Sequence, residues 1–185
     1  MTDLVPLTAL GAETPRRAAF GALTLTERPD IALASLALRR GGAAPAPFGL
    51  ALPGPGGLVQ ADDHAAFWTG PQQWMLMAGG GAGADFAAAL LAAVPGASVT
   101  EQTDGWAIFD ISAPAAEPLE RLLERLVNLP PEATAPGRAT RTMLHHMPVF
   151  VLRRGATEIT LLGMRSAAQG LWHALETAAR RQAAG

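Results

Sequence analysis

Apolar and polar residues alternate in several stretches of the chain, which is the pattern of β-strands with one buried face. Within residues 21–28, leucines at positions 23 and 25 alternate with threonines at positions 24 and 26. Successive side chains of a strand point to opposite faces, so this alternation predicts a half-buried strand. Turn residues bound the other stretches that are predicted as strands: Ile31–Arg39, His64–Thr69, Gln73–Ala78, Ala97–Glu101, Gly105–Ser112, Gly137–Arg154 and Glu158–Gly163.

Three other stretches space their apolar residues three and four positions apart, as on one face of a helix. The second of them begins either at Ser112 as the N-cap, with Pro114 in the first turn, or only at Pro118. Ser166 is predicted to cap the third. The helices and their core-facing positions are Ala84–Val94 with Phe86, Leu90, Leu91 and Val94; a helix ending near Val127 with Leu119, Leu122, Leu123 and Leu126; and a last helix with Leu171, Trp172, Leu175 and Ala179.

Short connections between the predicted strands indicate hairpins. Gly70-Pro71 separates one pair of strands and Thr103-Asp104-Gly105 separates another, and both spacings predict antiparallel pairing. Residues 137–154 are predicted as one long strand, in which Pro148 marks a bulge or a sheet edge. Residues 43–57 contain four prolines, so they are predicted as a loop around one short helical turn.

The order of these elements predicts an α+β fold with mainly antiparallel sheets and helices on one face. The C-terminal half reads strand, helix, strand, strand, helix, which is a ferredoxin-like plan, and the N-terminal half is a strand-rich version of it. We therefore expect two ferredoxin-like halves, about residues 20–102 and 103–183, within a single domain spanning 20–183. Residues 1–19 are expected to form an irregular N-terminal arm that could lie across a partner.

Composition narrows the chemistry that this chain can perform. It has no Cys, Lys or Tyr, which excludes a thiolate nucleophile, a Schiff-base or Walker lysine and a tyrosine acid. The formal net charge of −2 argues against nucleic-acid binding. Only 16% of the residues are charged, so either a partner covers part of the surface or alanine dilutes the other residue types.

Neither a targeting segment nor a membrane segment is expected. The first ten residues contain Asp3 and Pro6 and lack a basic region followed by a long apolar core. The longest run of small apolar residues, 87–94, is too short to span a membrane. We therefore expect a cytoplasmic protein with no membrane partner.

A glycine-rich run is the one pattern that resembles a nucleotide site. Residues 79–84 fit G-x-G-x-x-A between a predicted strand and a helix, and Glu101 ends the next strand. In a Rossmann unit, such glycines admit a pyrophosphate and the acid binds a ribose. The flanking hairpins indicate an antiparallel sheet instead, so nucleotide binding is the less favoured interpretation.

The remaining candidate residues have simpler interpretations. The adjacent His145 and His146 would point to opposite faces of a strand, which excludes a shared metal ion. Solvated or core positions are favoured for His64, His173 and the pair Asp62-Asp63, and Arg165 is expected to pair with a carboxylate rather than to bind an anion. Trp68 and Trp74 flank a turn, where they anchor an interface or, as we favour, border the core of the domain itself. No catalytic, cofactor-binding or metal-binding residue is assigned.

The tryptophan hairpin also carries a resemblance to a known family. Residues 68–76, with the sequence WTGPQQWML, resemble the "W-x-G-P-x-x-W-L-L" hairpin of the gamma subunit family of heterotetrameric sarcosine oxidase. Further pieces follow in the order found in that family: the strand Trp106–Ser112 leading through Ala113-Pro114 into a helix, the segment Gly137–Arg154 with Arg141-Thr142 and Val151-Leu152, and Met164-Arg165-Ser166 followed by Leu171-Trp172.

This resemblance implies a non-catalytic gamma subunit of a sarcosine oxidase-like complex that demethylates sarcosine. Its partners would be the alpha, beta and delta subunits, which would bind FAD, FMN, NAD and tetrahydrofolate, while this chain would bind no cofactor. The fold would be similar to part of the folate-dependent aminomethyltransferase fold. The alternative is a stand-alone folate-binding protein of the aminomethyltransferase type, in which a carboxylate such as Asp110 and an arginine hold the folate tail.

Overall fold

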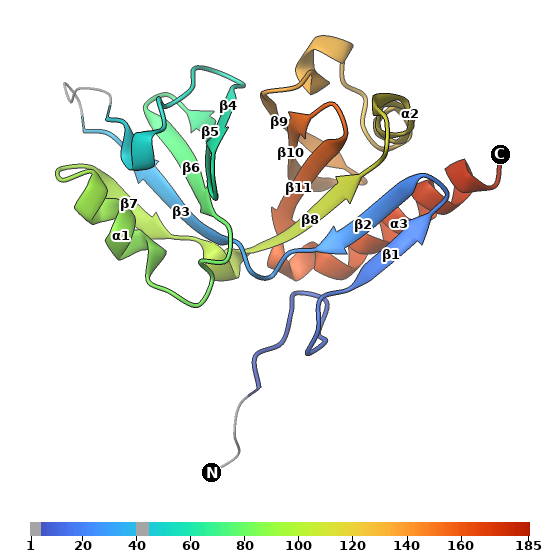
Figure 1. Ribbon diagram of the computed structural model, residues 1–185, viewed down its shortest axis with the longest axis horizontal. Helices are drawn as coiled ribbons and strands as arrows, with labels where there is room; N and C mark the ends of the chain where they lie inside the picture. Colours follow the sequence, from blue (N-terminus) through green and yellow to red (C-terminus); the bar gives the residue numbers. More distant parts are fainter. Residues whose placement is uncertain (1–4, 40–44) are drawn as a thin grey trace.

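Two antiparallel sheets form the framework of the computed structural model, which describes residues 5–39 and 45–185. We call them the large sheet and the small sheet (Figure 1). In spatial order, the large sheet contains β1 (Arg17–Phe20), β2 (Leu23–Glu27), β8 (Trp106–Ser112), β11 (Glu158–Met164), β10 (Met147–Gly155) and β9 (Arg138–Leu144). The small sheet contains β4 (Leu58–Ala61), β5 (His64–Gly70), β6 (Gln73–Ala78), β3 (Ala32–Ala37) and β7 (Ser98–Glu101).

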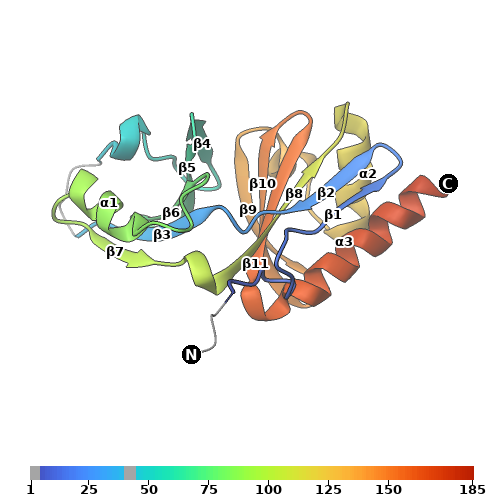
Figure 2. The same ribbon diagram turned by 60° about the horizontal axis from the view of Figure 1, so that its bottom comes forward.

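The two sheets face each other, and helices cover their outer faces (Figures 1 and 2). The helix α1 (Phe86–Ala93) packs on the small sheet, whereas α2 (Ala116–Leu126) and α3 (Ala168–Ala183) pack on the large sheet. Short 3-10 turns complete the fold: η1 (Pro47–Gly49), η2 (Thr103–Gly105), η3 (Pro131–Thr134) and η4 (Arg165–Ala167). The predicted α+β class, with antiparallel sheets and helices on one face of each, is confirmed.

Both faces of the central strands of each sheet are buried, which explains why these strands are almost continuously apolar. In β8, Phe109 and Ile111 belong to the core under α2 and α3, while Ile108 faces the small sheet. In β3, Leu33 faces the large sheet and Leu36 lies under α1. Alternate residues thus enter different cores, as the period of two in a strand requires.

The sheets do not follow the expected boundary between the two halves near residue 102. The strand β2 pairs with β8, so both β1 and β2 join the strands of the second half. Nor do residues 97–101 and 105–112 pair as a hairpin, because β7 pairs with β3 in the small sheet and β8 lies in the large sheet. The turn η2 separates them, and the Thr103 hydroxyl accepts a hydrogen bond of 2.9 Å from the Leu33 amide.

Residues 137–154 form a hairpin, so the prediction of one long strand was wrong. The strands β9 and β10 pair around His145 and His146, whose φ angles are 44° and 70°. Two successive residues with positive φ make a tight turn that suits the twist of the flanking strands, and histidines seldom signal it. Pro148 lies opposite Met143 near the start of β10, a strand with a neighbour on each side.

The helices keep most of their predicted buried residues but begin at other positions. The buried positions predicted for α2 and α3 are confirmed. However, α2 begins at Ala116, and neither it nor α3 has a side-chain cap, so the predicted caps at Ser112 and Ser166 were wrong. In α1, Leu91 is 47% exposed, because at about 100° per residue it lies outside the arc of Phe86, Leu90 and Val94.

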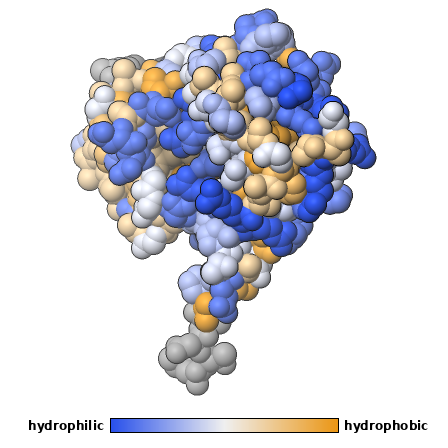
Figure 3. All heavy atoms as spheres, turned by 45° about the vertical axis from the view of Figure 1, so that its right-hand side comes forward, coloured by the Kyte–Doolittle hydropathy of each residue, from blue (hydrophilic) through white to orange (hydrophobic). Residues whose placement is uncertain are grey.

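The N-terminal segment is exposed at residues 5–7, where it extends from the body of the molecule (Figure 3), and it packs against the domain from Thr8 onward. Leu10 is buried; its amide donates a hydrogen bond of 2.9 Å to Glu27, and its carbonyl accepts one of 2.8 Å from Gln169. The predicted arm ends at Arg17, where β1 begins, while Val5 and Leu7 are exposed. Residues 1–4 and 40–44, which include the start of the arm and of the proline-rich loop, lie outside the described residues.

Candidate functional site

The layer between the two sheets, here called the seam, contains a buried polar network at one end and exposed apolar side chains at the other. Its middle is an apolar cluster in which the ring of Phe150 lies 5.0 Å from Phe67 and 5.9 Å from Trp106. Backbone hydrogen bonds close one side, where the Leu58 amide donates to Gly137 at 2.9 Å and the Ala139 amide donates to the Gly56 carbonyl at 3.0 Å. A cavity lies at each end of the seam, and the two cavities differ in the side chains that line them.

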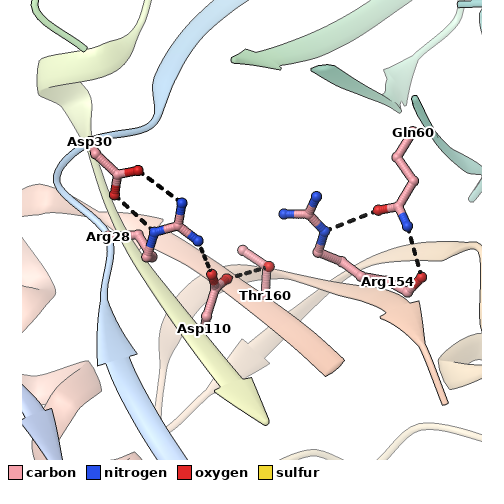
Figure 4. Close-up of polar contacts among 6 residues, drawn as sticks. All are labelled: Arg28, Asp30, Gln60, Asp110, Arg154 and Thr160. Carbon is pink, nitrogen blue, oxygen red and sulfur yellow. Dashed lines mark hydrogen bonds and ion pairs between the residues drawn. The ribbon is translucent and has the colours of Figure 1, made fainter. Parts of the chain in front are cut away.

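The polar end of the seam is built around Arg28, which lies between two carboxylates (Figure 4). Its guanidinium donates two hydrogen bonds of 2.8 Å to Asp30 and a third to Asp110. Asp110 is buried in β8, and it also accepts a hydrogen bond of 2.5 Å from the Thr160 hydroxyl of β11. The two oxygens of Asp110 are thus engaged by different partners within the chain.

This network stabilises the charged forms of Arg28 and Asp30. The hydrogen bond from Arg28 holds the pKa of Asp30 below its ordinary value, against the opposing effect of burial. The hydrogen bond to Asp30, together with the charge of Asp110, raises the pKa of Arg28, although burial alone would lower it. Arg28 forms an ion pair with each of the two acids, so the network acts as an internal brace that joins the segment after β2 to β8.

A second contact at the polar end joins the two sheets. The Arg154 side chain donates to the amide oxygen of Gln60 at 3.0 Å, and the Gln60 amide donates back to the Arg154 carbonyl at 3.1 Å (Figure 4). A small cavity of about 160 Å³ lies between these groups and also contacts Asp62, Asp63 and Glu158. Arg28 and Arg154 line it together with these three acids, so the two signs of charge nearly balance.

The other end of the seam opens as a cavity of about 320 Å³, which we call the apolar groove. The small sheet ends there at the turn after Gly70, so part of the large sheet is left uncovered. The groove is lined by Thr69 and Gln73 from the hairpin and by Trp106, Arg141, Pro148 and Met164 from the large sheet. Met143 and Met164 are 54% and 44% exposed, high values for apolar side chains.

The glycine-rich run does not form a nucleotide site, because its helix end is already occupied. Asp85 caps α1 by accepting a hydrogen bond of 2.9 Å from the Ala88 amide, and Glu101 accepts one of 3.2 Å from Ala87. Burial disfavours the charged form of Glu101, but bonds from Thr103 and its neighbours outweigh it and lower its pKa. Two carboxylates at this helix N-terminus would repel a phosphate.

The histidines are dispersed among unrelated positions. The ring of His64 stacks on Phe48 at 4.3 Å, His145 and His146 form a turn, and His173 is exposed on α3. In the ranges that the structure describes, no three His, Asp or Glu side chains gather as metal ligands do. Nor is any described helix both long and apolar enough to cross a membrane.

Trp68 and Trp74 border a core of the domain itself, as the favoured interpretation of the sequence predicted. Trp74 is buried against the α1 side of the small sheet, and its indole donates a hydrogen bond of 2.8 Å to the Pro53 carbonyl. Arg165 was expected to pair with a carboxylate, but it donates instead to the Leu7 carbonyl at 2.9 Å. It therefore holds the N-terminal segment against η4.

The sequence indicated Asp110 as a candidate but missed its partners. Arg28 ends one predicted strand and lies 82 residues from Asp110, while Thr160 lies 50 residues beyond it. No local motif links positions so far apart. The exposed methionines were also missed, although strand alternation would have placed Met143 and Met164 on the same face as Phe150 and Leu162.

Comparisons with known proteins relate the fold to two kinds of structure. No protein-family model matches the sequence, and neither does any curated protein. A chain of the heterotetrameric sarcosine oxidase from Corynebacterium sp. U-96 is similar, with a TM-score of 0.73 and 23% identity over 91% of this chain and 89% of that one. Aminomethyltransferase T of the glycine cleavage system from Bartonella henselae is also similar, with a TM-score of 0.60 and 17% identity over 87% of this chain. The match spans 50% of the length of that aminomethyltransferase.

Proposed function

We propose that this chain is a non-catalytic gamma-type subunit of a complex like heterotetrameric sarcosine oxidase. In this proposal the alpha, beta and delta subunits complete the complex, and FAD, FMN, NAD and tetrahydrofolate bind to them. The chain would support the assembly of an oxidase that demethylates sarcosine or a related N-methyl amine. Its contribution would be a surface for packing rather than a reacting group.

One observation carries this proposal. The similarity to a chain of a heterotetrameric sarcosine oxidase extends over nine-tenths of both chains, 91% of this one and 89% of the other. The two chains therefore have similar lengths and share their fold almost from end to end. A whole subunit, rather than one domain of a larger chain, is the unit of similarity.

The contacts of the candidate residues support the same proposal. The carboxylates of Asp110 and Glu101 accept hydrogen bonds from neighbouring groups of the fold, and Arg28 is bound by two acids. The polar atoms of these groups are engaged within the fold, whereas a catalytic base or a ligand-binding cation would keep a free atom for its substrate. Apolar side chains meanwhile lie exposed at the groove, where a partner could cover them.

The likeness to aminomethyltransferase T favours a second candidate, a stand-alone folate-binding protein. That function would require a carboxylate such as Asp110 and an arginine to face the ligand. Asp110 is buried, and both of its oxygens are engaged by Arg28 and Thr160. The residues present therefore do not fit a folate tail at this position, and the subunit proposal is preferred.

Purification of a tagged chain from its native host tests the proposal. Three co-purifying chains and the absorbance of a flavin, identified by mass spectrometry and a spectral scan, are expected. A colourless chain of 19.1 kDa that elutes alone would contradict it.

Calorimetry of the isolated chain with tetrahydrofolate separates the second candidate from the first. No heat of binding is expected for the subunit proposal. Folate binding that is lost in Asp110→Asn, while Glu101→Gln still binds, would favour the aminomethyltransferase type instead.

A further inference from the structure

We propose that the apolar groove at the end of the seam binds an extended segment of a partner subunit that carries apolar side chains and one carboxylate. This inference rests on the proposed function and names the surface through which the subunit would assemble. It concerns the six lining residues introduced above and Met143, which continues the same row of side chains at the sheet edge.

Four apolar side chains form a continuous row across the large sheet. Met143 lies opposite Pro148, and Met164 lies opposite Trp106. The pairing of Val149 with Gly163 places Pro148 level with Met164, so the row crosses β9, β10, β11 and β8. At about 4.8 Å between strands, it extends for about 14 Å.

This row belongs to the face of the large sheet that the small sheet covers elsewhere. Phe150 and Leu162 lie two residues further along their strands and are buried against the small sheet. The hairpin of β5 and β6 ends before it reaches the row, and it contributes Thr69, Gln73 and the buried Met75 to the opposite wall. The groove is thus a continuation of an internal packing surface that this chain does not fill.

The shape and flexibility of the groove suit an extended segment. Side chains on one face of a strand recur about every 6.6 Å, so two or three of them match a row of about 14 Å. Methionine side chains are unbranched and flexible, and they adapt their shape to an apolar partner. A segment that matches the row therefore runs across the strands of the large sheet, from β9 toward β8.

Arg141 gives the groove its charge. It lines the cavity from β9 and is exposed, and its guanidinium makes no hydrogen bond or ion pair with any other residue in the ranges 5–39 and 45–185. No Asp or Glu lines this cavity. A carboxylate on the occupant would therefore meet an unpaired guanidinium, which binds such groups through two parallel hydrogen bonds.

The same charge argues against a second copy of this chain as the occupant. In a two-fold symmetric contact, one patch meets the identical patch of its partner. The two grooves would then bring two Arg141 guanidinium groups together with no acid among the lining residues to separate them. A different chain, with an acid among its apolar side chains, is complementary.

Photo-crosslinking in the native complex tests this assignment. Benzoylphenylalanine replaces Met143 in one tagged chain and Leu91 in a matched chain, because Leu91 is similarly exposed at 47% but lies on α1. The probe at position 143 is expected to attach to one peptide of a partner subunit that contains Asp or Glu beside apolar residues. The probe at position 91 is expected to miss that peptide.

Variants that introduce or reverse a charge in the groove supply an independent measurement, the recovery of the partner chains. Met143→Glu and Arg141→Glu are each expected to lower the recovery of the partner chains about tenfold or more, since a charge in an apolar contact or opposite a like charge is strongly unfavourable. Arg141→Lys is expected to lose less binding than Arg141→Glu, because it keeps the charge but not the two parallel hydrogen bonds, and Leu91→Glu is expected to retain all of it. Circular dichroism melting controls for folding, because all three positions are exposed.

The outcomes separate this inference from the proposed function. Partner chains that co-purify with Met143→Glu and Arg141→Glu at within about twofold of the unmodified recovery, or a crosslink to a second copy of this chain, would overturn the inference alone. The absence of partner chains from the unmodified protein would overturn the proposed function and this inference with it.

Discussion

The two ends of the seam are built from the same pair of sheets but differ in whether their side chains find partners within the chain. At the polar end, Arg28, Asp110 and Thr160 find their hydrogen-bond partners inside the chain. At the apolar end, Met143 and Met164 face solvent on a surface that is buried two residues further on. The polar groups of the first end are satisfied within the chain, whereas the apolar side chains of the second end remain exposed.

This difference separates side chains that stabilise the fold from side chains that a partner would cover. A buried charge must be paired, because an unpaired one costs several kcal/mol. The polar end of the seam therefore looks like a site but stabilises the fold. The exposed apolar row beside the unpaired Arg141 side chain does not stabilise the fold in this way, and it is the surface that the proposed partner would cover.

The largest effect on stability is expected in the middle of the seam, which holds both ends together. Phe150→Ala removes a ring that packs on Phe67 and Trp106. Such truncations leave a cavity and cost about 3–5 kcal/mol, which urea unfolding followed by circular dichroism would measure. A loss below about 1 kcal/mol would mean that the sheets do not depend on this contact.

At the polar end, Asp110→Asn keeps the shape of the side chain but removes its charge. The variant leaves Arg28 with Asp30 alone, and we expect a loss of about 2 kcal/mol, less than for a fully buried pair because Arg28 is partly exposed. The double variant Arg28→Met/Asp110→Asn should lose less than the sum of the single variants. Additive losses would show that the two side chains are not coupled.

The pH dependence of stability should also reveal the polar end. Because the folded state lowers the pKa of Asp30, this carboxylate stabilises the fold above its unfolded pKa of about 3.9, and the contribution is lost as the pH falls below about 4. The effect should stay below about 1 kcal/mol because Asp30 is 45% exposed. Urea unfolding between pH 3 and 7 should show a shallower acid dependence for Asp30→Asn than for the unmodified chain; equal slopes would contradict this assignment.

The smallest effect is expected at the apolar end. Met143→Ser and Met164→Ser should change the stability of the free chain by no more than about 0.5 kcal/mol, since both side chains are largely exposed. The same urea titration measures it, with Met75→Ser, whose side chain is buried between the two sheets, as the destabilised comparison. A loss above 1 kcal/mol for either exposed methionine would show that the groove serves the fold rather than a partner.

Much of the fold could be predicted from local pattern, because alternation and helical spacing record burial directly. The strands β2, β3, β6, β7 and β8 lie within predicted segments, as do α1 and the core-facing leucines of α2, and β5 and β11 each extend one residue beyond theirs. The pairing of strands could not be read in the same way. Nothing local distinguishes the spacing of β7 and β8 from a hairpin, because the contact of Thr103 with Leu33 that parts them spans 70 residues.

The polar end of the seam and the groove lay beyond sequence analysis for different reasons. The brace joins Arg28 to Asp110 across 82 residues, so only the folded sheet brings them together. The exposure of Met143 and Met164 follows from where the hairpin after Gly70 stops. Alternation can assign a side chain to a face, but it cannot show how far the facing sheet extends.

Methionine oxidation by dilute hydrogen peroxide, followed by mass spectrometry, tests the contrast between the free and the assembled subunit most directly. In the free chain, Met143 and Met164 should oxidise fast and the buried Met75 and Met77 slowly. In the complex purified from the native host, oxidation of Met143 and Met164 should slow about fivefold or more, because a partner covers them. Met147 faces away from the groove and should keep its rate. Unchanged rates at positions 143 and 164 in an intact complex would contradict the assignment of the apolar groove as its assembly surface.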